Sequence, residues 1–84
     1  QDEADAIAQA NATRFGLGAS VWTQDLEKGE AMLRQLDVGN AFLNAQVASD
    51  IRMPFGGVKA SGLGRELGEA GIREFCNTKS IWVA

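Results

Sequence analysis

The sequence predicts an α/β fold in which helices and strands alternate along one small unit. Apolar residues recur at helical spacing in three segments, a short apolar run of strand length follows each of them, and one glycine-rich loop interrupts the alternation. Such alternation is typical of a parallel or mixed sheet covered by helices. With 84 residues, the chain is near the lower limit at which one core supports itself without disulfides or metals.

The first predicted helix covers residues 4–12, where alanines and Ile7 recur every three or four positions behind a group of acidic residues. Acidic side chains stabilise the positive end of a helix, and Gly16 is placed to end it. The apolar run 19–23 that follows contains a valine and a tryptophan. We expect this run to form a buried strand.

The second predicted helix begins after Asp25, whose carboxylate can accept a hydrogen bond from the free N–H groups of the first turn. Three leucines share one face of this helix, and Gly39 ends it. The segment 40–44 that follows is short and apolar between two asparagines. It predicts a second strand.

The second half of the chain opens with a long predicted loop over residues 45–64, which holds the only proline and a dense group of glycines. A backbone of this composition can approach other groups closely, so we expect the loop to line a site or an interface. Residues 65–77 show helical spacing, weakened by Gly68 and Gly71, and residues 79–84 predict a terminal strand.

Composition excludes several classes of partner. No cluster of Lys and Arg with interleaved aromatic residues is present, so we expect no nucleic-acid partner. No run of eighteen apolar residues is present, so we expect no membrane span. The single cysteine excludes an internal disulfide and fits a reducing compartment, from which we expect a cytoplasmic location.

Catalytic chemistry is excluded in the same way. The chain has no histidine, which rules out a Ser-His-Asp or Cys-His pair, and the lone Cys76 cannot form a zinc cluster. The spacing from Gly57 to Gly62 lacks the lysine of a phosphate-binding P-loop. The G-x-G stretches at 16–18 and 62–64 lack the third glycine of a dinucleotide fingerprint. We therefore predict no catalytic residue in this chain.

A resemblance to a known family covers essentially the whole chain. Pro-Phe-Gly-Gly-Val-Lys at 54–59, followed by Ser-Gly at 61–62 and Gly-Arg-Glu at 64–66, resembles the C-terminal segment of the NAD(P)-dependent aldehyde dehydrogenases. Further segments are similar to that family in order and spacing, namely 6–11, 15–17, 21–26 and 39–44. Residues 71–77 and 81–83 most resemble the succinate-semialdehyde dehydrogenase branch.

The resemblance implies that residues 1–78 are the C-terminal part of an aldehyde dehydrogenase catalytic domain and that residues 79–84 are a strand of the oligomerisation region. It implies a homo-oligomeric parent that oxidises a small aldehyde, succinic semialdehyde, to its acid with NAD or NADP. The catalytic cysteine, the catalytic glutamate and the cofactor domain of that family lie upstream, so the chain alone is expected to be inactive. Cys76 lies outside the family's catalytic motif and is expected to be a small buried side chain.

The resemblance also implies roles for individual residues. Phe55 corresponds to a phenylalanine that walls the substrate tunnel, with packing under a turn as the alternative. Ser49 corresponds to a serine that helps to hold the substrate carboxylate, although a plain turn serine is the simpler interpretation. Lys59 and Gly62 correspond to positions whose carbonyls contact a monovalent cation in some members. Glu66 is expected to cap the adjacent helix with its carboxylate.

Some alternatives stay open at this point. Arg52 can either bind a substrate carboxylate or pair with a neighbouring acid. Asp50 would repel a substrate carboxylate. Trp82 is expected to take part in packing or to contact another subunit. The acidic start without methionine suggests a chain cut from a longer one, although processing would leave the same end. Two alternatives to the succinate-semialdehyde branch stay open: a free-standing, non-catalytic α/β interaction module, and a fragment of another aldehyde dehydrogenase branch.

Overall fold

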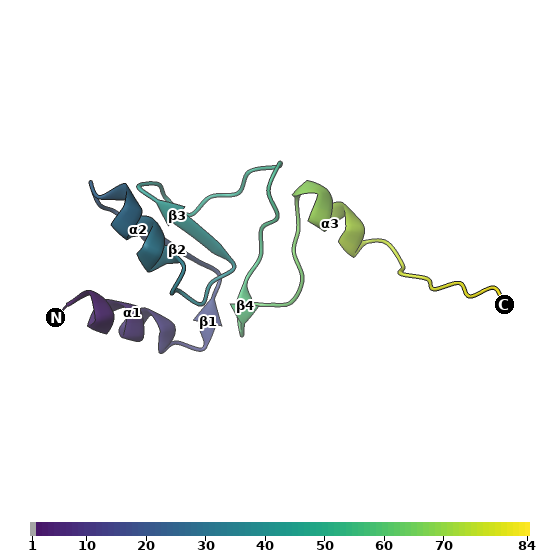
Figure 1. Ribbon diagram of the computed structural model, residues 1–84, viewed down its shortest axis with the longest axis horizontal. Coiled ribbons are helices and arrows are strands. Elements are labelled where there is room, and N and C mark those ends of the chain that lie inside the picture. The colour runs from purple at the N-terminus through teal and green to yellow at the C-terminus, as the bar shows by residue number, and fades with distance from the viewer. Residues whose placement is uncertain (1) are drawn as a thin grey trace.

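The computed structural model describes residues 2–84 and confirms a mixed helix and strand architecture (Figure 1). The first two helices and the strands that follow them lie together, and the last helix lies toward the opposite end of an elongated molecule. In chain order the elements are α1 (Glu3–Asn11), β1 (Phe15–Gly16), β2 (Gly18–Val21), α2 (Leu26–Leu33), β3 (Asn40–Leu43), β4 (Val58–Lys59) and α3 (Gly68–Glu74).

The strands form two small sheets. β2 and β3 are parallel, with Gly18 opposite Asn40 and Val21 opposite Leu43, and α2 provides the connection and packs against both strands. β1 and β4 are antiparallel, with Phe15 opposite Lys59. The parallel pairing expected between strands joined by a helix is therefore present, but the strands form two separate sheets instead of one parallel or mixed sheet. β4 lies in the segment 45–64 that the sequence predicts to be loop throughout.

The predicted start of the second helix is confirmed, whereas the predicted end of the first helix is wrong. The Oδ1 atom of Asp25 accepts a 3.1 Å hydrogen bond from the backbone N–H of Lys28, as a capping aspartate should. Helix α1 ends at Asn11 instead of continuing to Gly16, because Gly16 belongs to β1. A Cβ at Gly16 would lie 2.5 Å from the carbonyl oxygen of Asp37, so this glycine permits a close backbone approach.

The last helix is shorter than predicted, and its predicted cap is wrong. α3 begins at Gly68 instead of residue 65, and its N-cap Leu67 has a positive φ of 65° with no side-chain cap. Glu66 does not cap the helix. Its backbone pairs with Phe55 through hydrogen bonds of 2.7 and 2.8 Å, which keeps residues 65–66 extended and delays the helix.

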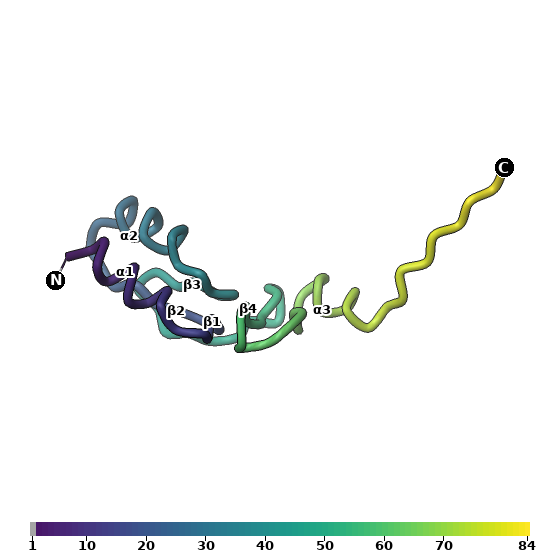
Figure 2. Tube along the Cα trace, turned by 90° about the horizontal axis from the view of Figure 1, so that it is seen from below, coloured from purple at the N-terminus to yellow at the C-terminus, as the bar shows by residue number. Residues whose placement is uncertain are grey.

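The predicted strand over residues 79–84 does not form in this structure. Residues 77–84 have no regular structure and extend away from the rest of the molecule (Figure 2). A strand is defined by pairing with a neighbour, and within the described residues no segment lies beside the tail to pair with it. Cys76, expected to be buried, is exposed at the base of this tail because no segment covers it.

Apolar side chains are conspicuously exposed. Among residues 2–84 no hydrophobic side chain is fully buried, and Trp22 and Trp82 are 63% and 92% exposed. The radius of gyration is 16.2 Å, whereas a compact chain of this length would have about 12 Å. The molecule measures 59 × 25 × 24 Å. The chain therefore folds locally without closing a core of its own.

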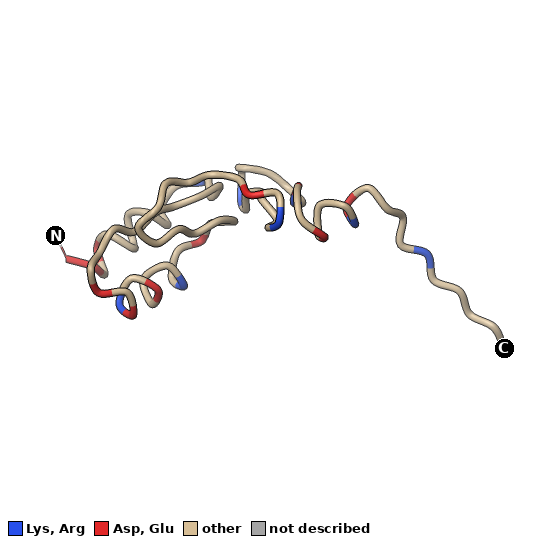
Figure 3. Tube along the Cα trace, turned by 90° about the horizontal axis from the view of Figure 1, so that it is seen from above, with Lys and Arg blue, Asp and Glu red and all other residues tan. Residues whose placement is uncertain are grey.

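Charged residues are spread along the molecule (Figure 3). Lys and Arg occur singly on the trace instead of gathering into one basic surface. Within the part of the chain that the structure describes, no helix has the length and apolar character needed to cross a membrane.

Candidate functional site

The glycine-rich loop crosses the start of β3 at very short range. A Cβ at Gly39 would collide with the carbonyl oxygen of Gly56 and lie 2.7 Å from its carbonyl carbon. On its other side, the Gly39 N–H donates a 3.0 Å hydrogen bond to the carbonyl of Gly16. Three backbone segments thus meet where side chains would keep them apart, which brings Phe55 against β3.

Phe55 is held through the backbone on both sides. Its own N–H and C=O pair with Glu66, as described above. The side-chain amide of Asn40, in β3, donates to the carbonyl of Pro54 and accepts from the N–H of Gly56, with both distances 3.1 Å. We call this pair of contacts the Asn40 clasp. It fixes the backbone that carries the half-buried Phe55 ring.

A cavity of about 390 Å³ lies between β3 and this loop. Phe55, Met53 and Phe42 give it an apolar wall, and Asp50 contributes a carboxylate. Its size falls at the lower end of the range typical of small-molecule sites, which are mainly apolar with a few polar groups. Phe55 thus lines a cavity in the structure, and its role in a substrate tunnel stays a prediction.

Ser49 is predicted to help hold the substrate carboxylate, and that role stays a prediction. Ser49 is exposed, and its neighbours Ala48 and Asp50 line the cavity. Arg52 pairs with Asp50 through a 2.7 Å contact from Nη2 and a 3.0 Å hydrogen bond from Nε. The Arg52 side chain and then its backbone N–H hold the pKa of the Asp50 carboxyl below its usual range. The same side-chain hydrogen bond raises the pKa of Arg52. Pairing with a neighbouring acid is thus the arrangement that Arg52 adopts.

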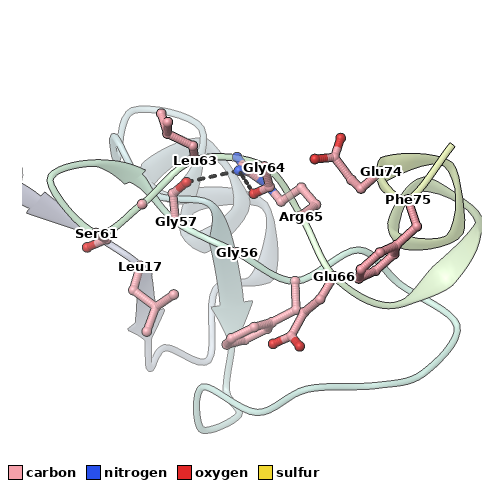
Figure 4. A pocket seen from close by; sticks show the side chains of 12 residues that line it. Leu17, Gly56, Gly57, Ser61, Leu63, Gly64, Arg65, Glu66, Glu74 and Phe75 are labelled. Atoms are coloured by element: carbon pink, nitrogen blue, oxygen red, sulfur yellow. Dashed lines mark hydrogen bonds between the residues drawn. The ribbon is translucent and has the colours of Figure 1, made fainter. Parts of the chain in front are cut away.

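A second cavity, of about 400 Å³, lies on the other side of the glycine loop (Figure 4). Arg65 reaches back across it and donates hydrogen bonds of 2.9 and 2.7 Å to the carbonyls of Gly57 and Gly64. The hydroxyl of Ser61, also in the lining, accepts a 2.8 Å hydrogen bond from the N–H of Gly16. With no histidine in the chain, Ser61 has no imidazole base to activate it. These polar groups hold the loop in shape.

Lys59 and Gly62, the predicted cation contacts, lie in one tight turn. The carbonyl of Lys59 accepts a 3.4 Å hydrogen bond from the N–H of Gly62. The Lys59 ammonium group reaches the carbonyls of Asn11 and Thr13, at 3.1 and 3.2 Å, at the C-terminal end of α1. The side chain of Lys59 therefore ties the loop to the first helix, and the cation contact stays a prediction.

Two further asparagines make paired contacts like those of the Asn40 clasp. Asn11 donates to the carbonyl of Gln35 at 2.7 Å and accepts from the N–H of Asp37 at 2.8 Å. Asn44 donates to the carbonyl of Thr23 at 2.9 Å and accepts from its N–H at 2.8 Å. Side-chain amides thus connect segments that are distant in the sequence.

The sequence analysis missed these asparagine contacts. Asparagine is depleted in strands because its amide competes with the backbone for hydrogen bonds. Asn40 and Asn44 stand at the two ends of a short apolar run. Their position there indicates that their side-chain amides form hydrogen bonds with the backbone of other segments. Which backbone segment each one binds is decided only by the fold.

Neither G-x-G stretch has the setting of a dinucleotide site, and residues 2–84 hold no cluster of acidic or cysteine metal ligands. Gly62-Leu63-Gly64 lies in an irregular loop and Gly16-Leu17-Gly18 joins β1 to β2, so neither opens a helix that could bind a pyrophosphate. No group of three or more Cys, Asp or Glu residues converges as metal ligands in this range. These residues do not fit NAD or NADP by themselves.

Comparisons with known proteins identify the family. The model of the aldehyde dehydrogenase family matches residues 1–81. The chain is 51% identical over 80 residues to a probable succinate-semialdehyde dehydrogenase [NADP(+)] of Synechocystis sp., covering 95% of this chain and 18% of that protein. It is 49% identical over 79 residues to succinate-semialdehyde dehydrogenase [NADP(+)] 1 of Mycobacterium ulcerans, covering 94% of this chain and 17% of that protein.

A solved structure agrees with these relatives. The succinic semialdehyde dehydrogenase of Streptococcus pyogenes, in complex with NADP+, superposes with a TM-score of 0.91 at 36% identity. The match covers 99% of this chain and 18% of that one, so the chain spans less than a fifth of the length of the relatives it matches. The chain belongs to the aldehyde dehydrogenase family.

Proposed function

We propose that this chain is the C-terminal part of the catalytic domain of an enzyme that oxidises succinic semialdehyde to its acid with NAD or NADP. The observation that carries the proposal is the near-half identity, over almost the whole chain, to relatives named for this activity. A cytoplasmic location accompanies it, on the strength of the single cysteine. The residues would serve a site completed by other parts of the parent enzyme.

Within that site, Phe55 forms part of the substrate wall. Phe55 lines the cavity beside β3 and also the cavity on the other side of the glycine loop, and an apolar surface there would keep water away from a bound aldehyde. The Asp50 charge is offset by Arg52, so the cavity does not present an unpaired negative charge to a substrate carboxylate. Ser49 and the carbonyls of Lys59 and Gly62 are secondary proposals, for the substrate carboxylate and for a monovalent cation respectively.

A chimeric enzyme tests the proposal directly. In the M. ulcerans relative, the homologous segment is replaced by this 84-residue chain. We expect the chimera to fold and to oxidise succinic semialdehyde, because about half of the aligned residues are the same in the two proteins. Butanal, which has the same chain length without the carboxylate, is the control substrate.

The outcomes of this experiment differ for the alternatives. A folded chimera that turns over butanal as well as succinic semialdehyde would assign the chain to another branch of the family. A folded chimera without dehydrogenase activity would contradict the proposal. A second chimera carries the segment of the S. pyogenes protein, which is itself named as a succinic semialdehyde dehydrogenase. Its activity shows how much is lost through grafting alone.

The chain by itself should be inert toward NAD(P) and succinic semialdehyde. Cys76, its only thiol, is exposed and donates a weak 3.6 Å hydrogen bond to the carbonyl of Ile72. The chain has no histidine that could act as its base. Reduction of NAD(P) by the purified chain, abolished by Cys76→Ala, would overturn this assignment.

Residues 79–84 are proposed to supply a strand to the contact between copies of the parent enzyme. Ile81, Trp82 and Val83 are 79%, 92% and 87% exposed, and the tail carries free backbone groups that a neighbouring strand can pair with. Ending the chimera at residue 78 should therefore lower its mass in light scattering from oligomer toward monomer. An unchanged mass would contradict the assignment.

A further inference from the structure

The backbone on the C-terminal side of Phe55 has little conformational restraint of its own, whereas the Pro54 ring fixes only its own φ. Pro54 lacks an N–H, so its carbonyl is the only backbone group it can contribute to pairing. Gly56 has no side chain and is free to rotate. An aromatic residue between them would change its direction readily unless other parts of the chain held both neighbours.

The Asn40 clasp supplies that restraint. One carboxamide pairs with the Pro54 carbonyl and the Gly56 N–H, 14 and 16 residues away, at 3.1 Å each. On the opposite side, Phe55 pairs with Glu66 through its own N–H and C=O. The amide thus acts as a stand-in for one peptide unit of a neighbouring strand, and Phe55 lies in the middle of a small three-part ladder.

Asn40 is itself fixed in place. It begins β3, its N–H donates a 3.1 Å hydrogen bond to the carbonyl of Leu17, and it lies opposite Gly18 in the parallel pair. A residue with this much backbone support transmits the position of β3 to the loop. The cavity that Phe55 lines is bounded on its other side by the same strand.

We propose that Asn40 is a positioning residue that sets the substrate wall by holding Phe55. The inference rests on the proposed role of Phe55 in aldehyde binding. Asn40 does not touch the substrate; it acts through the backbone of Pro54 and Gly56. Because Phe55 contacts the aldehyde in the ground state and the transition state alike, displacing it raises KM and leaves kcat within about twofold.

The test is a double-mutant cycle in the chimeric enzyme with Asn40→Leu and Phe55→Ala. Leucine has a similar size and removes both hydrogen bonds. Each hydrogen bond is worth roughly two- to tenfold in an equilibrium, so we expect KM for succinic semialdehyde to rise at least fivefold in Asn40→Leu. In the Phe55→Ala background the same change should raise KM less than twofold, because its target is gone.

Asn40→Asp separates the two halves of the clasp. It keeps an oxygen for the Gly56 N–H but sets a carboxylate against the Pro54 carbonyl, so its KM should also rise. Hydrogen exchange of the Gly56 amide gives a readout independent of activity and should be faster in Asn40→Leu than in the unsubstituted chimera. Unchanged exchange would overturn the inference even if the chimera were inactive.

Asn11→Leu is the matched control. Asn11 makes the same kind of paired contact, at 2.7 and 2.8 Å, but to Gln35 and Asp37 instead of the Phe55 loop. We expect it to lower stability and to leave KM within twofold. An equal rise of KM in both asparagine variants would show a general folding effect and would overturn the inference.

The cycle also distinguishes this inference from the proposed function. If Phe55→Ala leaves KM unchanged, Phe55 is not a substrate wall, and both statements fall. If Phe55→Ala raises KM but Asn40→Leu does not, or if the two effects simply multiply, only the role of Asn40 is wrong.

Discussion

Gly39 shows how a single missing side chain permits the fold. The backbone of Gly56 passes so close to it that any Cβ would overlap the Gly56 carbonyl. Backbone atoms cannot turn aside as the end of a side chain can, so Gly39→Ala should cost about 3 kcal/mol of stability. The measurement is the midpoint of thermal inactivation of the chimeric enzyme, which should fall.

Gly29→Ala provides the comparison. The added Cβ would meet Leu43 Cδ1 at 2.5 Å and Thr23 Cγ2 at 2.7 Å, which are side-chain atoms, and Gly29 lies inside α2. Alanine also favours a helix by about 1 kcal/mol over glycine, which offsets part of the crowding. A smaller loss of stability at position 39 than at position 29 would contradict this account of the crossing.

Asp50 offers a pH test on the same scale. Because Arg52 lowers its pKa, the carboxylate stabilises the turn fully above the ordinary aspartate pKa of about 3.9. That stabilisation is lost as pH falls through the lowered pKa. Arg52→Gln should return the titration of the Asp50 carboxyl, followed by NMR of the chain, toward the ordinary value. Arg14→Gln, whose guanidinium lies over Phe15 instead, should not.

At the scale of elements, the end of α1 depends on a residue of β4. The Lys59 ammonium group binds the carbonyls of Asn11 and Thr13, where the helix leaves carbonyls without partners. A cation at this end stabilises a helix by about 0.5 to 1 kcal/mol. In the chimeric enzyme, Lys59→Met should therefore speed hydrogen exchange of the Ala12 amide, which donates to Gln9, by roughly two- to fivefold.

Lys79→Met is the control for this change. Lys79 lies in the exposed tail, outside every helix and strand of the described residues. It should leave exchange in α1 unchanged. Equal exchange at Ala12 in the Lys59 variant and the unsubstituted chimera would mean that α1 is stable without the β4 contact.

At the scale of the whole molecule, the lack of a buried apolar side chain in residues 2–84 dominates. Hydrophobic burial is the main favourable contribution to cooperative folding. We expect the isolated chain to melt over a broad temperature range, to bind a dye specific for exposed apolar surface, and to show tryptophan emission typical of solvated side chains. Trp22 directly follows β2 and Trp82 lies in the tail, so the two report on separate parts of the chain.

The same measurement separates the two kinds of protein considered from the sequence. A sharp, reversible transition of a monomer would favour a free-standing interaction module and would contradict our expectation. Broad melting or self-association is the behaviour of a segment whose apolar faces and strand edges need other parts of an enzyme. A blue shift of tryptophan emission in the chimera would show that those faces become covered there.

Local sequence patterns determined much of this fold. The cap at Asp25, the amphipathic second helix, and the strands after each of the first two helices all follow from neighbouring residues. The Pro-Phe-Gly-Gly motif marked Phe55, and the order of motifs indicated the family that comparison with known proteins confirmed. These features depend on contacts within a few residues, which a linear pattern records.

Tertiary structure alone decided the rest. β4, the delayed start of α3, the partners of Asn40 and the anchoring by Lys59 all arise from hydrogen bonds between segments far apart in the chain. A two-residue strand has no periodicity to detect, and an amide can bind any backbone that comes near. The sequence by itself therefore determined the family and the principal helices, whereas long-range backbone pairing decided how Phe55 is held against its cavity.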